Sequence, residues 1–348
     1  MRTALRRLAV LAALARGERR GFITMTVQRT GSTWLSDELD AHPCITSGKE
    51  IFLNEKTGDP PWVWSDAKKR LALEALFDGQ ASLNFSATRS FEKFLGRCAG
   101  ARGDVACGFK WMMSQHVDRA WDAGWLPELC AARKLRLVFL ERLNLLRVHA
   151  STAAKNLAST SAGGHRNPTG EAPREAYIEL ASGDALVAKL EGIAAQYDGL
   201  RRVRAEAARR GVATLAVTYE ALQADRGGGL DRVARFVAGG GACDVGAYAF
   251  AGNASRQTQI HAGKLSSYVS NWAAVVDTLR PTRFACYLDE DDLARLEACR
   301  DAGRAREPSR AEDVGRRARK TVVAVCVLLL LVLGLERRGE QRQVRDNS

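Results

Sequence analysis

One short segment of the chain combines the residue types that bind phosphate or sulfate groups. Residues 28–33, Gln-Arg-Thr-Gly-Ser-Thr, follow an apolar run at 22–27 and overlap the start of a helical pattern at 33–41. A glycine between a strand and a helix lets the main chain approach a ligand, and the helix N-terminus offers N–H groups at the positive end of its dipole. Arg29 adds a forked cation. The segment therefore predicts an anion-binding loop, and an ordinary glycine turn with a hydroxyl N-cap is the alternative.

The elements that position this loop alternate along the chain. Short apolar runs predict strands, and they lie at 22–27, 105–109, 135–140 and 212–218. Helical patterns lie between them, and the apolar stripe of the clearest one, 184–210, indicates core packing. Such alternation favours a parallel sheet, so we expect an α/β fold with a P-loop-like parallel sheet flanked by helices. Turn-forming residues predict loops at 161–174, 225–229 and 238–246.

Composition limits the kinds of partner. The chain has 348 residues and a net charge of +12, which fits an anionic ligand or an anionic membrane surface. The basic residues are spread out rather than clustered with aromatic residues, so we expect no nucleic-acid partner. The eight cysteines contain no CxxC pair and are expected to be buried small hydrophobes, with the redox compartment left open. The five histidines are scattered, so no metal site is expected.

The two ends of the chain differ from its middle. Residues 1–20 are basic, and a signal segment, a transit segment and an ordinary first helix all fit them. Thr321 to Leu335 carry no charge; as a helix they would be ~22 Å long, short of the ~30 Å bilayer core, yet thinner membranes accommodate such lengths. We therefore expect a C-terminal hydrophobic helix that anchors the chain to a membrane. Its basic upstream flank would leave the main domain cytosolic, and an N-terminal signal would reverse this.

The expected order of domains follows from these patterns. It is a basic segment at 1–20, a main domain at 21–299, a charged linker at 300–320, an anchor at 321–335 and a polar tail at 336–348.

The loop at 28–33 resembles that of sulfotransferases that use 3'-phosphoadenosine-5'-phosphosulfate (PAPS). Further segments resemble carbohydrate-type and bacterial members of this family in the same order, and these are His42-Pro43 with Gly48 to Phe52, Gly108 to Met112 with Gln115, Val138 to Asn144, Val217 to Leu222, and Ser270 to Trp272. Together they cover about residues 20–290 and imply the sulfotransferase fold.

The resemblance also assigns roles to residues. It implies that the loop binds the 5'-phosphate and sulfate of PAPS through Arg29, Thr30, Gly31, Ser32 and Thr33. Arg142 and Ser151 would hold the 3'-phosphate. Because Ser151 is one residue further from Arg142 than in many members, Arg147 is a second candidate cation.

The resemblance implies a reaction as well. An acceptor oxygen or nitrogen attacks sulfur in line, and adenosine 3',5'-bisphosphate leaves as the bond from sulfur to its 5'-phosphate oxygen breaks. Catalysis is then largely positioning and charge stabilisation. Glu50 is the first candidate for the general base, with His42 and His116 as second choices, and Lys110 would reach a sulfate oxygen. We expect no metal, an acceptor that is a carbohydrate or lipid, and association with an internal membrane such as the Golgi.

Acceptor choice would lie in variable loops. Two candidates are 55–66, where Trp62 and Trp64 could stack on a sugar or simply pack, and 161–174.

Two other functions remain open. A P-loop-like nucleotide kinase is disfavoured because the pattern GxxxxGK[ST] is absent and no lysine follows Gly31. A non-catalytic, membrane-tethered binding protein is disfavoured by Arg29, Glu50 and Arg142.

Overall fold

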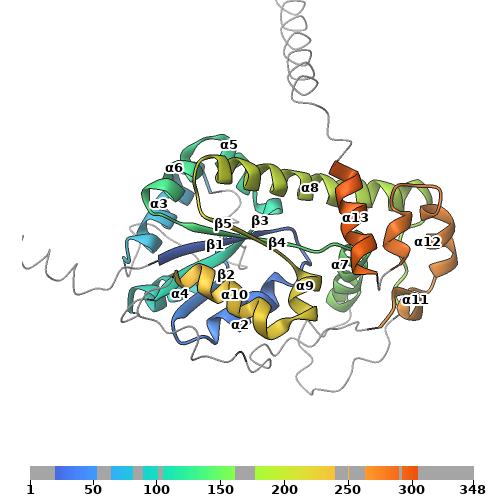
Figure 1. Cartoon of the computed structure of the whole chain (residues 1–348), viewed down its shortest axis with the longest axis horizontal. Coiled ribbons are helices and arrows are strands. Elements are labelled where there is room, and N and C mark those ends of the chain that lie inside the picture. The colour runs from blue at the N-terminus through green and yellow to red at the C-terminus, as the bar shows by residue number, and fades with distance from the viewer. Residues whose placement is uncertain are drawn as a thin grey trace, which may run out of the picture. The chain divides into compact units, whose positions relative to one another are not determined.

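The computed structural model shows an α/β fold built on one parallel sheet (Figure 1). It describes residues 20–52, 64–80, 89–100, 105–160, 177–239, 250, 263–289 and 292–304. The strands are β1 (Arg20–Thr26), β2 (Ile45–Glu50), β3 (Ala106–Met112), β4 (Arg136–Glu141) and β5 (Thr214–Thr218). Their order in the sheet is β2-β3-β1-β4-β5, and every neighbouring pair is parallel. The carboxyl ends of all five strands therefore meet at one edge, and the predicted α/β class with a parallel sheet flanked by helices is confirmed.

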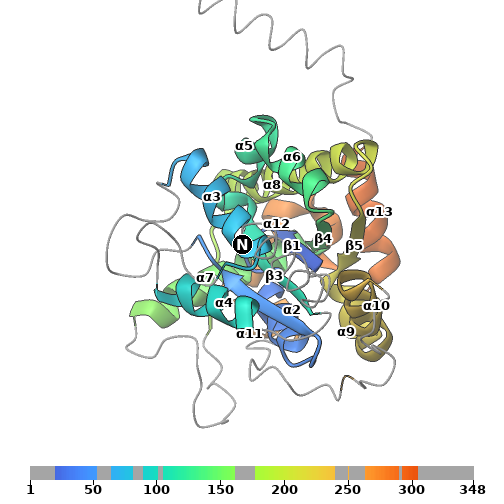
Figure 2. The same ribbon diagram turned by 90° about the vertical axis from the view of Figure 1, so that its left-hand side faces the viewer.

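Helices cover both faces of this sheet. In the first half of the chain they are α2 (Ser32–Asp40), α3 (Asp66–Phe77), α4 (Arg89–Gly100), η2 (Met113–Gln115), α5 (Val117–Asp122), α6 (Trp125–Ala132) and α7 (Leu145–Thr160). In the second half they are α8 (Gly183–Arg209), α9 (Tyr219–Ala224), α10 (Arg226–Ala238), α11 (Leu265–Tyr268), α12 (Trp272–Leu279), η4 (Ala285–Leu288) and α13 (Leu293–Arg304). Figure 2 views the sheet from its amino edge, with α8 on one side and α2 and α10 on the other.

The alternation of side chains along the strands builds the core. Phe22, Val138 and Leu140 belong to one apolar cluster with residues of α2 and α10, including Leu35 and Val233. In β1 and β4, the apolar residues that alternate with Phe22, Val138 and Leu140 point to the opposite face of the sheet. They are also fully buried there. Each such side chain stabilises the fold by roughly 1.5–3 kcal/mol. Helices must cover both faces of the sheet, because a parallel sheet carries apolar side chains on both sides.

The long helix α8 confirms the predicted core stripe. Leu186, Leu190, Tyr197 and Leu200 are buried along one side, whereas Ile193 is only partly covered. Tyr197 is one of the largest fully buried side chains.

The strand predictions were accurate except for β2, an outer strand of the sheet. The four predicted strands correspond to β1, β3, β4 and β5, although β3 continues to Met112. β2 was not predicted because its sequence, ITSGKE, lacks the apolar run of a buried strand. It is an edge strand, where polar residues are tolerated.

The predicted loop at 225–229 is wrong, because these residues start α10. Asp225 accepts a hydrogen bond from the N–H of Gly228 at 3.0 Å and so caps the helix. Glycine is tolerated in this first turn because the cap and the packing of Gly229 against Leu222 hold it in place. The loop predicted at 161–174 lies outside the described residues. Of the loop predicted at 238–246, Ala238 ends α10 and Gly239 follows it, and the rest lies outside the described residues.

The expectation that the cysteines are buried small hydrophobes holds for the burial of Cys98, Cys107 and Cys130, but it misses the disulfides. Cys98 of α4 and Cys107 of β3 form a disulfide, and Cys44, Cys286 and Cys299 are disulfide-bonded too. Among the described residues Cys130 is free and buried, and burial raises the pKa of its thiol to about 12. Pairing depends on distance in space, which spacing in the sequence does not reveal.

The chain divides into two compact units, Met1–Leu296 and Glu297–Ser348. The predicted anchor at 321–335 lies outside the described residues. Within the ranges that are described, no helix is long and apolar enough to cross a membrane.

Candidate functional site

The strand order puts a topological switch point at the carboxyl edge of the sheet, which is where open α/β sheets have their crevice. From β1 the chain first builds β2 and β3 on one side and then β4 and β5 on the other. Connections that leave in opposite directions open a gap beside the central strand, and ligands of open α/β sheets bind there. The loop at 28–33 follows β1 and lies at this position.

The backbone of the loop is held in an unusual conformation. Arg29 has a φ of 67° and Gly31 a φ of 83°, a region that non-glycine residues rarely adopt. The hydroxyl of Thr30 is buried, lies 2.5 Å from the hydroxyl of Thr26 and donates to the carbonyl oxygen of Val27. The Thr30 side chain therefore stabilises the loop, and any contact with a ligand is left to its main chain.

Helix α2 starts at this loop without a side-chain cap. Gly31 is its N-cap residue, and no side chain accepts a hydrogen bond from the first turn. Ser32 is buried and Thr33 half-buried. The N-terminus of α2 thus presents its dipole to the crevice with the first-turn N–H groups uncapped, which favours an anion.

Lys110 and Glu50 form a buried ion pair next to this helix end. The Lys110 Nζ lies 2.7 Å from the Glu50 Oε1, with side-chain exposures of 2% and 9%. It also donates to the Thr33 hydroxyl at 2.5 Å. Burial lowers the pKa of Lys110, and the Glu50 carboxylate opposes this shift. The predicted base and the predicted sulfate-binding lysine therefore lie together beside the loop.

An irregularity in the sheet brings these two side chains onto the same face. Gly48 of β2 pairs with Phe109 of β3, but the next paired residue is Glu50, which opposes Lys110. Lys49 is skipped, so Glu50 takes the orientation that Lys49 would otherwise have. Without this bulge Glu50 would point to the other side of the sheet.

The two predicted anion-binding segments also lie together. The Arg29 Nε donates to the Ser151 hydroxyl of α7 at 3.0 Å. The Arg142 Nη1 donates to the carbonyl oxygen of Arg29 at 3.3 Å. Burial lowers the pKa of Arg29, and the positive charge of Arg142 lowers it further, whereas Glu50 raises it. Two cations are thus held close to each other in a partly buried place.

Arg142 is surrounded by groups that the sequence had not assigned to the site. Its guanidinium lies 4.8 Å from the centre of the Tyr219 ring and its Nε lies 4.0 Å from the Glu220 Oε1. Its backbone N–H donates to the Tyr197 hydroxyl at 3.1 Å. The Arg142 Nε is buried and has no hydrogen-bond partner among the described residues. Such an atom is costly in a folded protein unless something else satisfies it.

The alternative candidates lie elsewhere or have other roles. His42 is buried, accepts the N–H of Cys44 at its Nδ1 and packs against Phe250, and burial lowers its pKa. His116 follows β3 with a φ of 62°. The Arg147 guanidinium donates to the carbonyl oxygen of Gly263. Burial raises the pKa of Tyr219, and the charges of Arg142 and Arg147 both oppose this shift.

The aromatic candidate for acceptor binding is part of the core. Trp64 is 6% exposed, packs edge-on against Phe52 and Phe91, and is covered by the Lys68 ammonium. Of the two expectations for this residue, simple packing is therefore the one observed. Trp62 and residues 161–174 lie outside the described residues.

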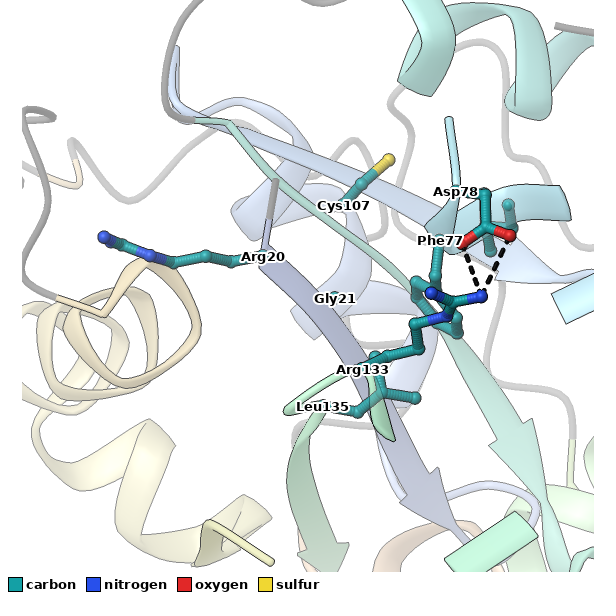
Figure 3. A pocket seen from close by; sticks show the side chains of 8 residues that line it. Arg20, Gly21, Phe77, Asp78, Cys107, Arg133 and Leu135 are labelled. Atoms are coloured by element: carbon teal, nitrogen blue, oxygen red, sulfur yellow. Dashed lines mark hydrogen bonds and ion pairs between the residues drawn. The ribbon is translucent and has the colours of Figure 1, made fainter. Parts of the chain in front are cut away.

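A small cavity of about 100 Å³ lies at the opposite, amino edge of the sheet (Figure 3). Its lining includes Arg20, Gly21, Cys107 and Leu135. Arg133 at its rim is paired with Asp78, and in Figure 3 the Arg20 guanidinium is turned away from Leu135. The cavity is thus remote from the loop after β1. Arg133 is paired with Asp78, and Arg20 donates to the carbonyl oxygen of Ala238.

Comparison with known proteins adds no relative. No protein-family model matches the chain, and no curated protein matches its sequence. In the described part of the chain, no group of histidine, cysteine and acidic residues is arranged to hold a metal ion.

Proposed function

We propose that the chain is a PAPS-dependent sulfotransferase of the P-loop-like fold. The observation that carries this proposal is the convergence of Arg29, Lys110 and Arg142 on the uncapped N-terminus of α2, with Glu50 beside them. Three cations against the carboxylates of Glu50 and Glu220 give the crevice an excess of positive charge. An anionic ligand with two separated phosphates would be attracted by this positive charge and would satisfy the buried Arg142 Nε.

In this proposal the residues divide between the two ends of the donor. The loop with Arg29, Gly31 and Thr33 binds the 5'-phosphate, where negative charge accumulates as the sulfuryl group leaves. Arg142 and Ser151 bind the 3'-phosphate. The donor supplies an activated sulfuryl group, and the protein contributes position and charge.

Glu50 acts as the general base. Its carboxylate takes the proton from the acceptor hydroxyl or amine as that atom attacks sulfur. The Lys110 ammonium contacts both Glu50 and Thr33. In this proposal it shifts from the base to a sulfate oxygen when the donor is bound. Burial lowers the pKa of Lys110, and the Glu50 carboxylate opposes this shift. In this proposal the Lys110 ammonium stabilises negative charge on that oxygen.

The acceptor and the location extend the proposal. We propose a carbohydrate or lipid acceptor and attachment to an internal membrane through residues 321–335, whose sequence is uncharged between basic flanks.

Thermal stability with ligands tests the function. The full-length protein is titrated with adenosine 3',5'-bisphosphate, the product left by the donor, and with ATP plus Mg²⁺. At 100 times the dissociation constant the bisphosphate should stabilise the protein by about 2.7 kcal/mol. Arg29→Ala should lose this shift, and Arg133→Ala, which changes an arginine at the far edge of the sheet, should keep it.

The other outcomes identify other functions. A shift with ATP and Mg²⁺ alone would favour the kinase. No shift with either nucleotide would favour the non-catalytic binding protein. If the bisphosphate binds, transfer of labelled sulfate from PAPS to hydroxyl and amine acceptors follows as the direct assay of activity.

A further inference from the structure

The corner between β5 and α9 contacts both anion-binding segments. Thr218 ends β5 and caps α9 by accepting the N–H of Ala221 at 3.2 Å. Tyr219 and Glu220 are the first two residues of the helix. Figure 1 shows α9 and α7 at the same end of the sheet, which is the end where the loop after β1 lies.

The ring of Tyr219 lies directly between the two segments. A Cβ added to Gly31 would come within 2.4 Å of the Tyr219 Cδ2, so the ring is pressed against the Gly31 backbone. The Arg142 guanidinium stacks over the same ring at 4.8 Å from its centre. Trp34 packs edge-on at 6.1 Å and supports the ring.

Glu220 holds the turn that carries Arg142. Its carboxylate accepts the N–H of Leu143 at 3.0 Å and that of Asn144 at 3.4 Å. It is also 4.0 Å from the Arg142 Nε. These contacts fix both the backbone and the direction of the cation, and they come from the element that supplies Tyr219.

We infer that Tyr219 is a positioning residue, which acts as a spacer that sets the distance between the Gly31 loop and the Arg142 turn. This inference rests on the proposed function. A nucleotide with phosphates on the 3' and 5' positions of its ribose gains affinity from two sites only when these sites are held at the matching distance. The second phosphate then binds within a complex that the first has already formed. Tyr219 therefore determines how much the second phosphate adds to affinity.

The test compares two ligands in the full-length protein. Adenosine 3',5'-bisphosphate carries both phosphates, and adenosine 5'-phosphate carries one. Their dissociation constants are measured by calorimetry, and the ratio of the two gives the gain from the 3'-phosphate. Loss of folded protein weakens both ligands equally, so this ratio does not respond to a purely structural defect.

Substitutions of Tyr219 separate the ring from its hydroxyl. Tyr219→Phe keeps the ring and should keep the ratio within about twofold. Tyr219→Leu and Tyr219→Met remove the flat surface, and the ratio should fall by roughly fivefold or more. Thermal denaturation of the ligand-free variants selects whichever of the two remains folded at the temperature of the measurement. Tyr177→Leu, which changes an exposed tyrosine, should leave the ratio unchanged.

Two results would overturn the inference. One is an unchanged ratio in a folded Leu or Met variant. The other is a ratio lost in Tyr219→Phe, because the hydroxyl and not the ring would then matter. If the wild-type protein binds neither nucleotide, the proposed function fails instead, and this result is distinguishable because it does not depend on Tyr219.

Discussion

Two arginines lie close together at the amino edge of the sheet, and two more at its carboxyl edge. The two pairs face helix ends of opposite dipole charge. At the amino edge Arg20 donates to the carbonyl oxygen of Ala238 and Arg136 to that of Phe236. Both carbonyls belong to the C-terminal end of α10, where the helix dipole is negative. At the carboxyl edge Arg29 and Arg142 lie near the N-terminus of α2, where the dipole is positive.

The difference shows that the number of arginines does not identify a binding site. The pKa of Arg136 is lowered by burial and by Arg20, much as that of Arg29 is lowered by burial and by Arg142. The first pair is offset by carbonyl oxygens of the protein. The second pair has its cations partly offset by Glu50 and Glu220, and under the proposed function an external anion completes it. The proposal therefore gives the amino edge a structural role and the carboxyl edge a functional one.

The largest expected effect is on turnover at the carboxyl edge. Glu50→Gln removes the proposed base but keeps its size, so kcat should fall by about 10²–10⁴-fold. Binding of adenosine 3',5'-bisphosphate should change by less than about twofold, because Glu50 does not hold the phosphates. Steady-state kinetics and calorimetry check the two values, and undiminished turnover would remove Glu50 from the mechanism.

The disulfide beside the amino-edge cavity should affect stability without affecting binding. Replacing both Cys98 and Cys107 by Ser should lower the free energy of unfolding by about 2–3 kcal/mol, because their bond closes a short loop in the unfolded chain. Chemical denaturation with and without a reductant measures this change. A loss of bisphosphate affinity in the folded variant would contradict the division between the edges.

A matched pair of arginine substitutions tests the comparison directly. Arg142→Ala should weaken binding of the bisphosphate by about 10–100-fold, the value of a charge-assisted contact. Arg136→Ala should leave that affinity within about twofold and lower the free energy of unfolding by about 1 kcal/mol, because it uncovers the end of α10. Equal effects of the two changes on affinity would show that the edges do not differ in this way.

The smallest expected effect is on the pH dependence of stability, through His42. Burial lowers the pKa of His42 below its usual 6.5, so the unfolded chain binds more protons in this range. The free energy of unfolding should therefore rise as pH increases toward 6.5 and fall in acid. His42→Asn should flatten this dependence, measured by denaturation at several pH values. The pH profile of turnover should stay unchanged, and a shifted profile would return His42 to the list of bases.

Part of the site follows from local sequence. The apolar runs at 22–27 and 135–140 predict β1 and β4, and Arg29 and Arg142 each come shortly after such a run. Residues that follow parallel strands must share one edge of the sheet, so these two arginines had to lie near each other. The glycine at position 31 marks the turn because its φ of 83° suits no other residue as well.

Other features depend on contacts between distant segments. β2 has no apolar signature, and the bulge that turns Glu50 toward Lys110 exists only in its pairing with β3. The same is true of the Cys98–Cys107 bond, the burial of Trp64 and the start of α10 within a run of glycines.

By itself, the sequence of this protein determined the alternation of strands and helices and the glycine turn between β1 and α2 that we propose binds an anion, because these depend on near neighbours in the chain. The tertiary structure alone decided which carboxylate faces Lys110, and it brought Tyr219 between Gly31 and Arg142. The reason is that strand register and side-chain packing depend on partners that lie far away in the sequence.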